Sequence, residues 1–433
     1  MPPKRKIVDD KKKNDKNTTS TANEDVTIPK KPKGNPLVTH PSHKSRECHV
    51  LTLGQGDVGQ LGLGEDIYER KRPALVPLPD AVKGKIVEAV AGGMHTVCLS
   101  STGEVFTFGC NDEGALGRDT SEEGSEFSVG KVDLSEKIVQ VSCGDSHTAA
   151  LTEDGRAYIW GTFRDANGPF GLTSKGMEKL PHRLPLQKTV VQISSGNDHV
   201  CMLTENGEIY SVGCGEQGQL GRIAEIFSLR GGRKGTSILL EPAFVHCRRI
   251  RGQGKVLFDN VWCTPYGTLA SRRGGGVYGW GLNNYHQLGF EDTRSRFMPE
   301  QVESFSHLTV KDIRGGQHHT ALLDNKGKVY TLGRTDYGRL GLGDGSKETY
   351  KPTQVSALDS EEVLSLGSGS SMSNCATKSG FLYSWGMGSN HQLGTGEEDD
   401  EVTPVKIISK QLESRKVFSA SGGGQHCVIL ACD

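Results

Sequence analysis

The chain has 433 residues, of which 34% are hydrophobic and 24% charged, and its formal net charge is −1. This length is enough for a large core, and no apolar run reaches the length of a membrane-spanning helix. The chain holds 57 glycines and 17 prolines, and a glycine excess without a collagen period indicates many tight turns.

Residues 1–47 are predicted to form a disordered basic tail. Residues 1–33 hold ten Lys/Arg and five Asp/Glu, a net of +5 that leaves −6 for the rest of the chain. The segment is polar and without periodicity, which is typical of disorder. Lysine clusters of this kind are typical of nuclear import through importin and of phosphate contacts with DNA. The basic side chains assigned to these roles are Lys4, Arg5, Lys6, Lys11, Lys12, Lys13, Lys30, Lys31 and Lys33.

A short apolar run that ends in glycine recurs seven times after the tail. The terminal glycines are spaced by 55, 52, 52, 68, 52 and 53 residues, which indicates one repeated unit with one insertion. The runs are 50–54, 105–109, 157–161, 209–213, 277–281, 329–333 and 382–386.

Each unit also contains a second apolar run, which in most units follows a G-x-x-H loop such as Gly92 to His95. An x-Gly pair then leads to the next glycine-ended run, as at Thr102-Gly103, and such pairs are strong hairpin signals. Seven units of short strands predict a seven-bladed β-propeller of four-stranded blades over residues 48–433. The first run lacks a preceding strand and the last run, 426–430, lacks a following one. Pairing of these two would close the ring and remove two open edges.

Eleven cysteines occur without any CxxC pair. The odd total and the absence of a secretory signal favour reduced, mostly buried thiols. The spacing predicts no metal site, and no cofactor is expected.

Residues 163–170 replace the plain loop that follows the glycine-ended run in the other units. An Asn-Gly hairpin signal at Asn167-Gly168 lies between apolar ends, so the segment predicts a projecting β-ribbon. A variable surface loop is the alternative.

Residues 222–255 form the insertion in the fourth unit and hold eight basic and two acidic side chains. Arginines on a glycine-rich loop can bind carboxylates bidentately. A solvated basic loop is the alternative.

The repeats resemble the regulator of chromosome condensation family from about Cys48 to the end of the chain. The motifs that carry the resemblance are LGQGDVGQLG at 53–62, CNDEGALGR at 110–118 and CGEQGQLGR at 214–222. The founding member of this family catalyses GDP/GTP exchange on the GTPase Ran while it is bound to nucleosomes. The resemblance therefore implies a nuclear, chromatin-associated exchange factor. Such a factor does no covalent chemistry.

The resemblance also implies roles for individual residues. The ribbon would be the family's wedge against the GTPase, although Pro169 and Phe170 depart from the usual aliphatic pair. The insertion would bind the histone acidic patch of the nucleosome through Arg230, Arg233 and Lys234, and Pro2 would become the methylated N-terminus. The GTPase-binding set it implies is Asp57, His95, Asp145, Asp198, His286, His318 and His426, with Phe163, Arg164, Asp165, Asn167, Gly168, Pro169 and Phe170.

Three alternatives remain at this point. The repeated histidines are consistent with hydrogen bonding inside the blades. Asp145, Asp198 and His318 could instead serve as acids and bases of an enzyme, although the low aromatic content, 6%, is unlike a small-molecule or glycan pocket. A chromatin-binding scaffold without exchange activity is the third alternative.

Overall fold

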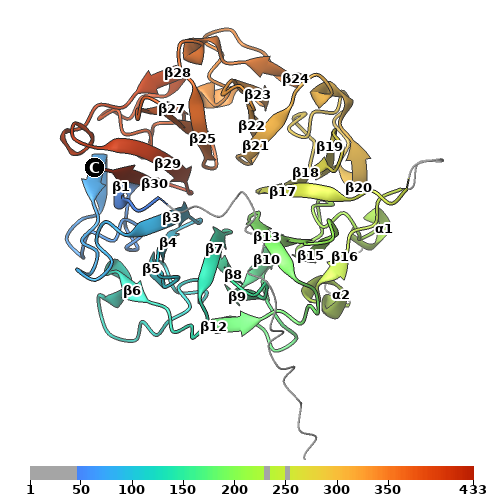
Figure 1. Ribbon diagram of the computed structural model, residues 1–433, viewed down its shortest axis with the longest axis horizontal. Coiled ribbons are helices and arrows are strands. Elements are labelled where there is room, and N and C mark those ends of the chain that lie inside the picture. Colours follow the sequence, from blue (N-terminus) through green and yellow to red (C-terminus); the bar gives the residue numbers. More distant parts are fainter. Residues whose placement is uncertain (1–45, 229–234, 249–253) are drawn as a thin grey trace, which may run out of the picture. The chain divides into compact units, whose positions relative to one another are not determined.

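The computed structural model describes residues 46–228, 235–248 and 254–433. These residues form seven four-stranded antiparallel sheets and one two-stranded sheet. The four-stranded sheets are arranged radially as the blades of a propeller (Figure 1), which confirms the predicted fold class. Among the described residues, no helix is long and apolar enough to cross a membrane.

Each blade runs from an inner strand A to an outer strand D. The A strands are β29 (Lys416–Gly422), β3 (Ile86–Ala91), β7 (Ile138–Cys143), β13 (Val190–Ser195), β17 (Phe258–Thr264), β21 (Val310–Gly315) and β25 (Val363–Ser368), in blades 1 to 7. The B strands are β30 (His426–Cys432), β4 (His95–Ser100), β8 (His147–Thr152), β14 (His199–Thr204), β18 (Gly267–Arg272), β22 (His319–Asp324) and β26 (Met372–Thr377).

The C strands contain the seven repeated glycine-ended runs. They are β1 (His49–Gln55), β5 (Val105–Gly109), β9 (Ala157–Gly161), β15 (Ile209–Gly213), β19 (Val277–Gly281), β23 (Val329–Gly333) and β27 (Leu382–Gly386). The D strands are β2 (Glu69–Leu75), β6 (Gly130–Lys131), β12 (Glu178–Arg183), β16 (Ala243–Phe244), β20 (Arg296–Gln301), β24 (Thr349–Gln354) and β28 (Glu401–Lys406).

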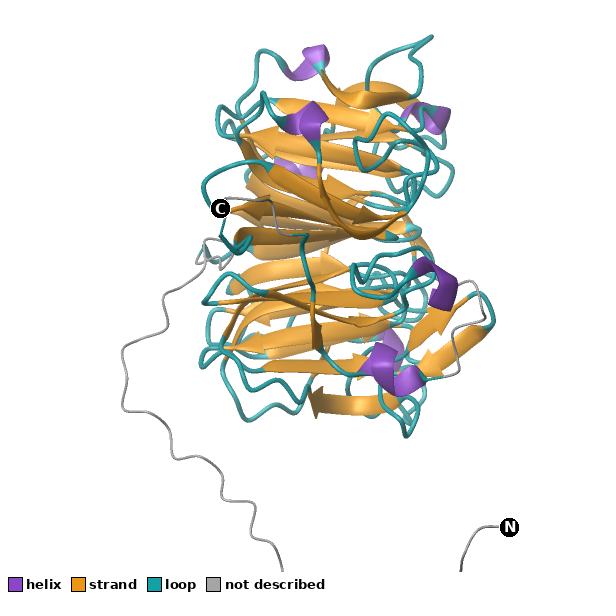
Figure 2. Ribbon diagram, turned by 90° about the vertical axis from the view of Figure 1, so that its right-hand side faces the viewer, coloured by secondary structure: helices purple, strands orange, loops and turns teal. Residues whose placement is uncertain are grey.

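Other elements are short and lie in the connections. The ribbon consists of β10 (Phe163–Asp165) and β11 (Gly168–Gly171), and the insertion contains helices α1 (Glu225–Ser228) and α2 (Thr236–Leu240). Viewed edge-on, the helices lie in loops at the periphery of the propeller (Figure 2). The five 3-10 turns are Ser125–Phe127, Glu303–Phe305, Asp336–Gly338, Ser356–Leu358 and Lys410–Leu412.

The ring closes as predicted, because β1 pairs with β30 in an antiparallel register from His49–Ala431 to Gly54–His426. The same register places Cys48 opposite Cys432, and the two are joined in a disulfide. The expectation that every cysteine is reduced was therefore wrong for this pair, because residues 384 positions apart become neighbours only in the closed ring.

The core consists of apolar clusters at the junctions between blades. B strands such as β4, β8 and β14 are buried along their whole length, because a blade covers each of their faces. Side chains also join neighbouring blades, as where Gln140 donates to the carbonyl of Ile193 at 3.0 Å and accepts from its N–H at 3.0 Å. Rigid junctions of this kind hold the connecting loops in fixed positions.

Candidate partner-binding face

One face of the propeller, here called the loop face, carries both the A–B loops and the C–D connections. Each strand C ends where strand B begins: Gly161 pairs with His147, for example, and Gly213 with His199. Both connections therefore leave the blade at the same edge. The A–B loops of the loop face are 92–94, 144–146, 196–198, 265–266, 316–318, 369–371 and 423–425.

The A–B loops are joined to one another by backbone hydrogen bonds around the central channel. The second residue of one loop donates to the next loop, as from Asp145 N–H to the Asn197 carbonyl at 2.8 Å and from Asn197 N–H to the Pro265 carbonyl at 3.0 Å. Bonds of this kind link every consecutive pair of loops except those of blades 5 and 6. There the donor position is taken by Pro265, which has no N–H to donate. This belt makes the loop face a fixed platform.

The repeated histidines are bonded inside the blade junctions. The Nε2 atom of His95 lies 3.0 Å from Thr148 Oγ1 in the next blade, and this hydroxyl donates to the Ala115 carbonyl at 2.8 Å. The imidazole must therefore be the donor to the hydroxyl, which places a proton on Nε2. The same arrangement joins His199 to Thr268, His319 to Ser373 and His426 to Thr96.

Burial favours the neutral form of His95 and His426. It lowers the pKa of His95 to about 4 and that of His426 to about 3. Both side chains are only 1% exposed, so the two rings support the loops from below rather than facing solvent. The structure therefore offers no direct partner contact for His95 or His426.

Asp57 and His286 lie in C–D connections of the loop face. Asp57 is exposed. His286 has a left-handed backbone (φ 61°) at the position that Gly59 and Gly218 occupy in other units. Its Nδ1 lies 3.0 Å from the Phe290 carbonyl oxygen and its Nε2 lies 3.4 Å from Glu348. Both ring nitrogens of His286 thus already have partners in this chain, one in its own loop and one in the C–D connection of blade 6.

Asp145 and Asp198 form an acidic pair in neighbouring A–B loops. Burial raises the pKa of Asp198 to about 7, against a hydrogen bond from the Arg164 N–H at 2.7 Å, and the charge of Asp145 adds to the rise. Burial also raises the pKa of Asp145, opposed by Arg164. Perturbed carboxyl groups in a fixed, solvent-accessible position are typical of binding sites. The pair can accept a cationic side chain from a partner.

His318 occupies the position in blade 6 that Asp198 occupies in blade 4. The N–H that follows each strand-C glycine bonds to the carbonyl at this position, from Cys214 to Asp198 and from Arg334 to His318. The His318 ring is partly exposed and meets Tyr285 edge-on, with centroids 4.8 Å apart. Arg334 lies over the Tyr285 ring, 4.6 Å from its centroid. Burial lowers the pKa of His318, and the charges of Arg339 and Arg334 lower it further.

The ribbon is held to the loop face by three carboxylates. Asp198 accepts from the Arg164 N–H, Glu113 pairs with the Arg164 guanidinium, and Glu216 accepts from the Ala166 N–H at 3.1 Å. Ala166 and Asn167 connect the two strands and are exposed, as is Pro169. The predicted ribbon is confirmed, but its turn lies one residue earlier than Asn167-Gly168, and Gly168 opens β11 with φ 102°.

Phe163 is the root of the ribbon and is fully buried. Its ring packs edge-on against His147, with centroids 4.9 Å apart. In the blade next to His147, Val200 occupies the position where the other repeated histidines have a hydroxyl partner. The His147 ring therefore packs against Phe163 at this junction. Among the predicted ribbon residues, Phe163 anchors the segment and does not offer a surface to a partner.

Other predicted residues lie outside the described part of the chain. They are Pro2, Lys4, Arg5, Lys6, Lys11, Lys12, Lys13, Lys30, Lys31 and Lys33 of the tail, and Arg230, Arg233 and Lys234 of the insertion.

The structure adds Glu113, Glu216 and Tyr285, which sequence reasoning had not singled out. Glu113 and Glu216 belong to the CNDEGALGR and CGEQGQLGR motifs and so looked like ordinary repeat residues. The structure also brings the ligand atoms of His199, Cys201 and Cys263 within 4.8 Å of one another. Hydrogen bonds already occupy all three groups, because His199 and Cys201 bond to the Thr268 hydroxyl and Cys263 bonds to a backbone carbonyl.

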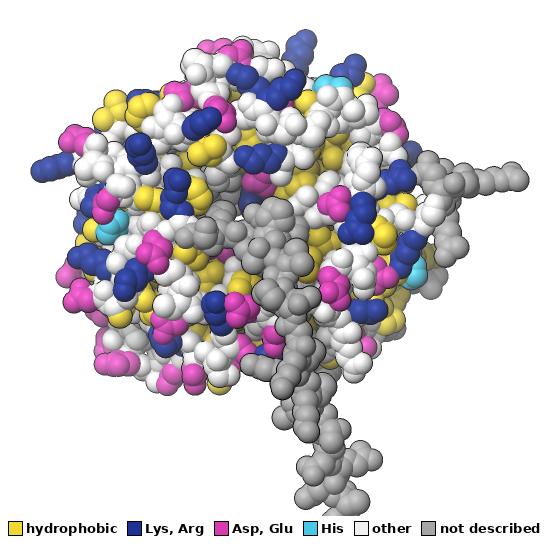
Figure 3. Space-filling view, viewed as in Figure 1, with side chains coloured by type: hydrophobic (Ala, Val, Ile, Leu, Met, Phe, Trp, Pro, Cys, Tyr) yellow, Lys and Arg dark blue, Asp and Glu magenta, His cyan; other side chains and the backbone are white. Residues whose placement is uncertain are grey.

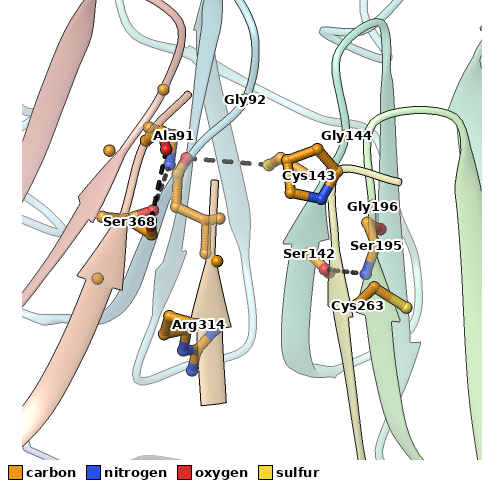
Figure 4. Close-up of a pocket in the computed structure, with 18 of the residues that line it drawn as sticks. Ala91, Gly92, Ser142, Cys143, Gly144, Ser195, Gly196, Cys263, Arg314 and Ser368 are labelled. Atoms are coloured by element: carbon orange, nitrogen blue, oxygen red, sulfur yellow. Dashed lines mark hydrogen bonds between the residues drawn. The ribbon is translucent and has the colours of Figure 1, made fainter. Parts of the chain in front are cut away.

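The central channel is lined chiefly by small residues. Glycine, serine and alanine of the A strands form most of its wall, and Arg314, Glu88 and Asp145 are its charged members. Figure 4 shows labelled lining residues from neighbouring A strands and A–B loops, with a hydrogen bond from the Ser195 N–H to Ser142 Oγ at 2.8 Å. No aromatic or histidine side chain is among the described lining residues.

A family model named RCC1-like domain matches residues 49–429. The chain belongs to this family. The regulator of chromosome condensation of Xenopus laevis is 54% identical over 404 residues, which cover 93% of this chain and 94% of that protein. The guanine nucleotide exchange factor SRM1 of Saccharomyces cerevisiae is 29% identical over 433 residues, which cover 88% and 86%.

Two solved yeast structures share the RCC1-like fold. One is Prp20p of Saccharomyces cerevisiae, described with its binding properties to Gsp1p and histones; its TM-score is 0.79 at 29% identity, over 90% of this chain and 93% of that one. The other is yeast RCC1 (Prp20) bound by Kap60, with a TM-score of 0.80 at 27% identity, over 96% and 97%. The chain is therefore a relative of guanine nucleotide exchange factors.

Proposed function

We propose that this RCC1-like propeller is the guanine nucleotide exchange factor of Ran and acts while bound to chromatin in the nucleus. The observation that carries the proposal is the fixed acidic pair, Asp145 and Asp198, beside a ribbon that projects from the same face. The relatedness to an exchange factor and to a protein with binding properties to Gsp1p and histones supports this assignment.

Exchange requires no covalent step from this chain. A factor that binds the nucleotide-free GTPase more tightly than the loaded form weakens nucleotide binding by the same factor, because the two equilibria are linked. The acidic pair would hold a cationic side chain of Ran, and His318 would contact Ran from blade 6. The ribbon tip, Ala166 to Pro169, would enter beside the nucleotide phosphates. Incoming nucleotide, chiefly GTP because of its cellular excess, then displaces the factor.

Release of a fluorescent GDP analogue from Ran tests the function directly. Catalytic amounts of the protein should accelerate release by at least about 1,000-fold, which corresponds to about 4 kcal/mol of barrier reduction. A small GTPase of another subfamily is the specificity control. Nucleosome binding without any acceleration would identify the chain as a scaffold and reject the exchange function.

Chromatin contacts are assigned to two other segments. The tail would bind DNA phosphates and importin, and methylation of Pro2 after removal of Met1 would fix a positive charge there. Arg230, Arg233 and Lys234 would enter the histone acidic patch of the nucleosome. On the face in Figure 3, Lys/Arg and Asp/Glu side chains of the described residues are interspersed. The clustered lysines of the tail sequence are suited to phosphate contacts.

Removal of these contacts should separate chromatin binding from exchange. Arg230→Ala with Arg233→Ala should weaken nucleosome binding by about 2 kcal/mol or more, and deletion of residues 1–33 should flatten the salt dependence of DNA binding. Both variants should release GDP from Ran in solution at the parent rate. Titration against nucleosomes and naked DNA at several salt concentrations measures both effects, and an unchanged salt slope would contradict the role of the tail.

A further inference from the structure

The second strand of the ribbon packs against the base of the insertion. Phe170, in β11, is partly buried against a cluster formed by Leu220, Ile223 and Leu239. Phe227, in α1, packs against the same cluster. These contacts join two segments that the sequence places in different units.

The insertion base is itself fixed to the loop face. Ser228, the last residue of α1, donates its hydroxyl to the Gly215 carbonyl at 3.0 Å. Arg222 donates to the carbonyls of Leu239 and Glu241 at 3.4 and 3.2 Å. The next residue after Gly215 is Glu216, the carboxylate that holds the N–H of the ribbon turn. One short stretch of chain therefore connects α1 to the ribbon tip.

A cleft of about 300 Å³, counting its open mouth, lies between Asp165 and Phe170 on one side and Ile223, Phe227 and Leu239 on the other. A two-stranded hairpin by itself is marginally stable in water. Three carboxylates hold the first strand and the turn. On the second strand, the Gly171 N–H donates to Thr162 Oγ1 at 3.1 Å, and the Phe170 ring adds apolar contacts with the insertion base.

We propose that Phe227, Ile223 and Leu239 are positioning residues for nucleotide exchange, because together they form a socket for Phe170 that sets the place of the ribbon tip. The proposal rests on the proposed function and adds a role for the insertion base that is separate from chromatin binding. The socket residues do not touch the GTPase. They act through the ribbon.

Phe227→Ala and Leu239→Ala test the socket. Ile226→Ala and Ile238→Ala are matched controls, because these neighbours on the same two helices are 62% and 50% exposed. We expect each socket variant to lower the kcat of GDP release about tenfold, since misplacement of a reacting or wedging group by about 1 Å can cost up to 100-fold. The KM for Ran should stay within about twofold, because the acidic pair and His318 are unchanged, and Phe227→Leu should recover most of the kcat.

Hydrogen exchange of the Ala166 amide in the free protein provides a readout that does not depend on Ran. We expect faster exchange in both socket variants and parent-like exchange in both controls. A fall in thermal stability with kcat and the Ala166 amide unchanged would overturn the proposal, as would equal effects in socket and control variants. If the parent itself fails to accelerate GDP release, the proposed function fails, while the amide measurement still decides whether the socket holds the ribbon.

Discussion

Replacement of residues 165–169 by a short Gly-Ser link should reduce release of GDP from Ran at least 100-fold. A flat face cannot enter a nucleotide pocket, and the ribbon tip is the projecting part of the loop face that carries exposed residues next to the acidic pair. Loss of a preorganised group at a reacting site typically costs about 100-fold or more. Nucleosome and DNA binding should be unchanged, because the replaced residues lie outside the tail and the insertion. Stopped-flow measurement of GDP release checks the result.

Phe163→Ala is the contrasting variant for this experiment. The side chain is fully buried against His147 and the core of the blade 3–blade 4 junction, so its truncation should cost about 3–5 kcal/mol of unfolding free energy. The Gly-Ser variant keeps Phe163 and should unfold at nearly the parent urea concentration. Release of GDP at the parent rate by a folded Gly-Ser variant would contradict the wedge and leave exchange to the acidic pair and His318.

Sequence periodicity was sufficient for the propeller because each blade repeats the same local signals. The runs ending in Gly54, Gly161 and Gly333 became C strands, and the turns at Gly103 and Gly327 have positive φ. Closure also followed from the sequence, because only two runs lacked a partner. Local signals of this kind predict the strands, the turns and their order. For a ring of similar blades, this information is nearly enough to predict the fold.

Contacts between blades were not accessible to the same reasoning. The partner of His95 is Thr148, 53 residues away, and the break in the loop belt depends on Pro265 facing blade 6. The sequence was consistent with hydrogen bonding of the repeated histidines inside the blades, but it did not show that the partner is a hydroxyl of the next blade. Cys48 and Cys432 were missed for a related reason, since their proximity exists only in the closed ring.

The ribbon shows both sides of this limit. Its departure from the repeat predicted a projection, and the Asn-Gly pair placed the turn to within one residue. Neither signal could reveal that Glu113, Asp198 and Glu216 hold its backbone and side chain, because these residues come from three separate connections. Local sequence signals can therefore predict that a ribbon forms. Its position depends on contacts with residues that are distant in the sequence.

Asp198→Asn should impair exchange and at the same time stabilise the fold at alkaline pH. Asparagine can still accept the Arg164 N–H but cannot carry the charge that a cationic side chain of Ran would require. Loss of such a contact should cost about 2 kcal/mol, or about 30-fold in affinity for the GTPase. His319→Ala, which alters a fully buried imidazole bonded to Ser373, should instead lower stability at every pH.

The stability gain follows from the direction of the pKa shift. The folded-state pKa of Asp198 is raised to about 7 from 3.8, so the folded protein holds this proton more tightly than the unfolded chain. The resulting stabilisation is fully present below about pH 4 and is lost as the pH rises through about 7. Asparagine does not ionise, so the variant keeps its free energy of unfolding as the pH rises. The difference in unfolding free energy between the variant and the parent should grow from near zero at about pH 4 to at most about 4 kcal/mol at about pH 8. Urea unfolding of both proteins at several pH values measures this difference. If the variant is no more stable than the parent at about pH 8, groups of the free protein already stabilise the Asp198 carboxylate. The assignment of Asp198 as a binding group for a cationic side chain of the partner would then have to be withdrawn.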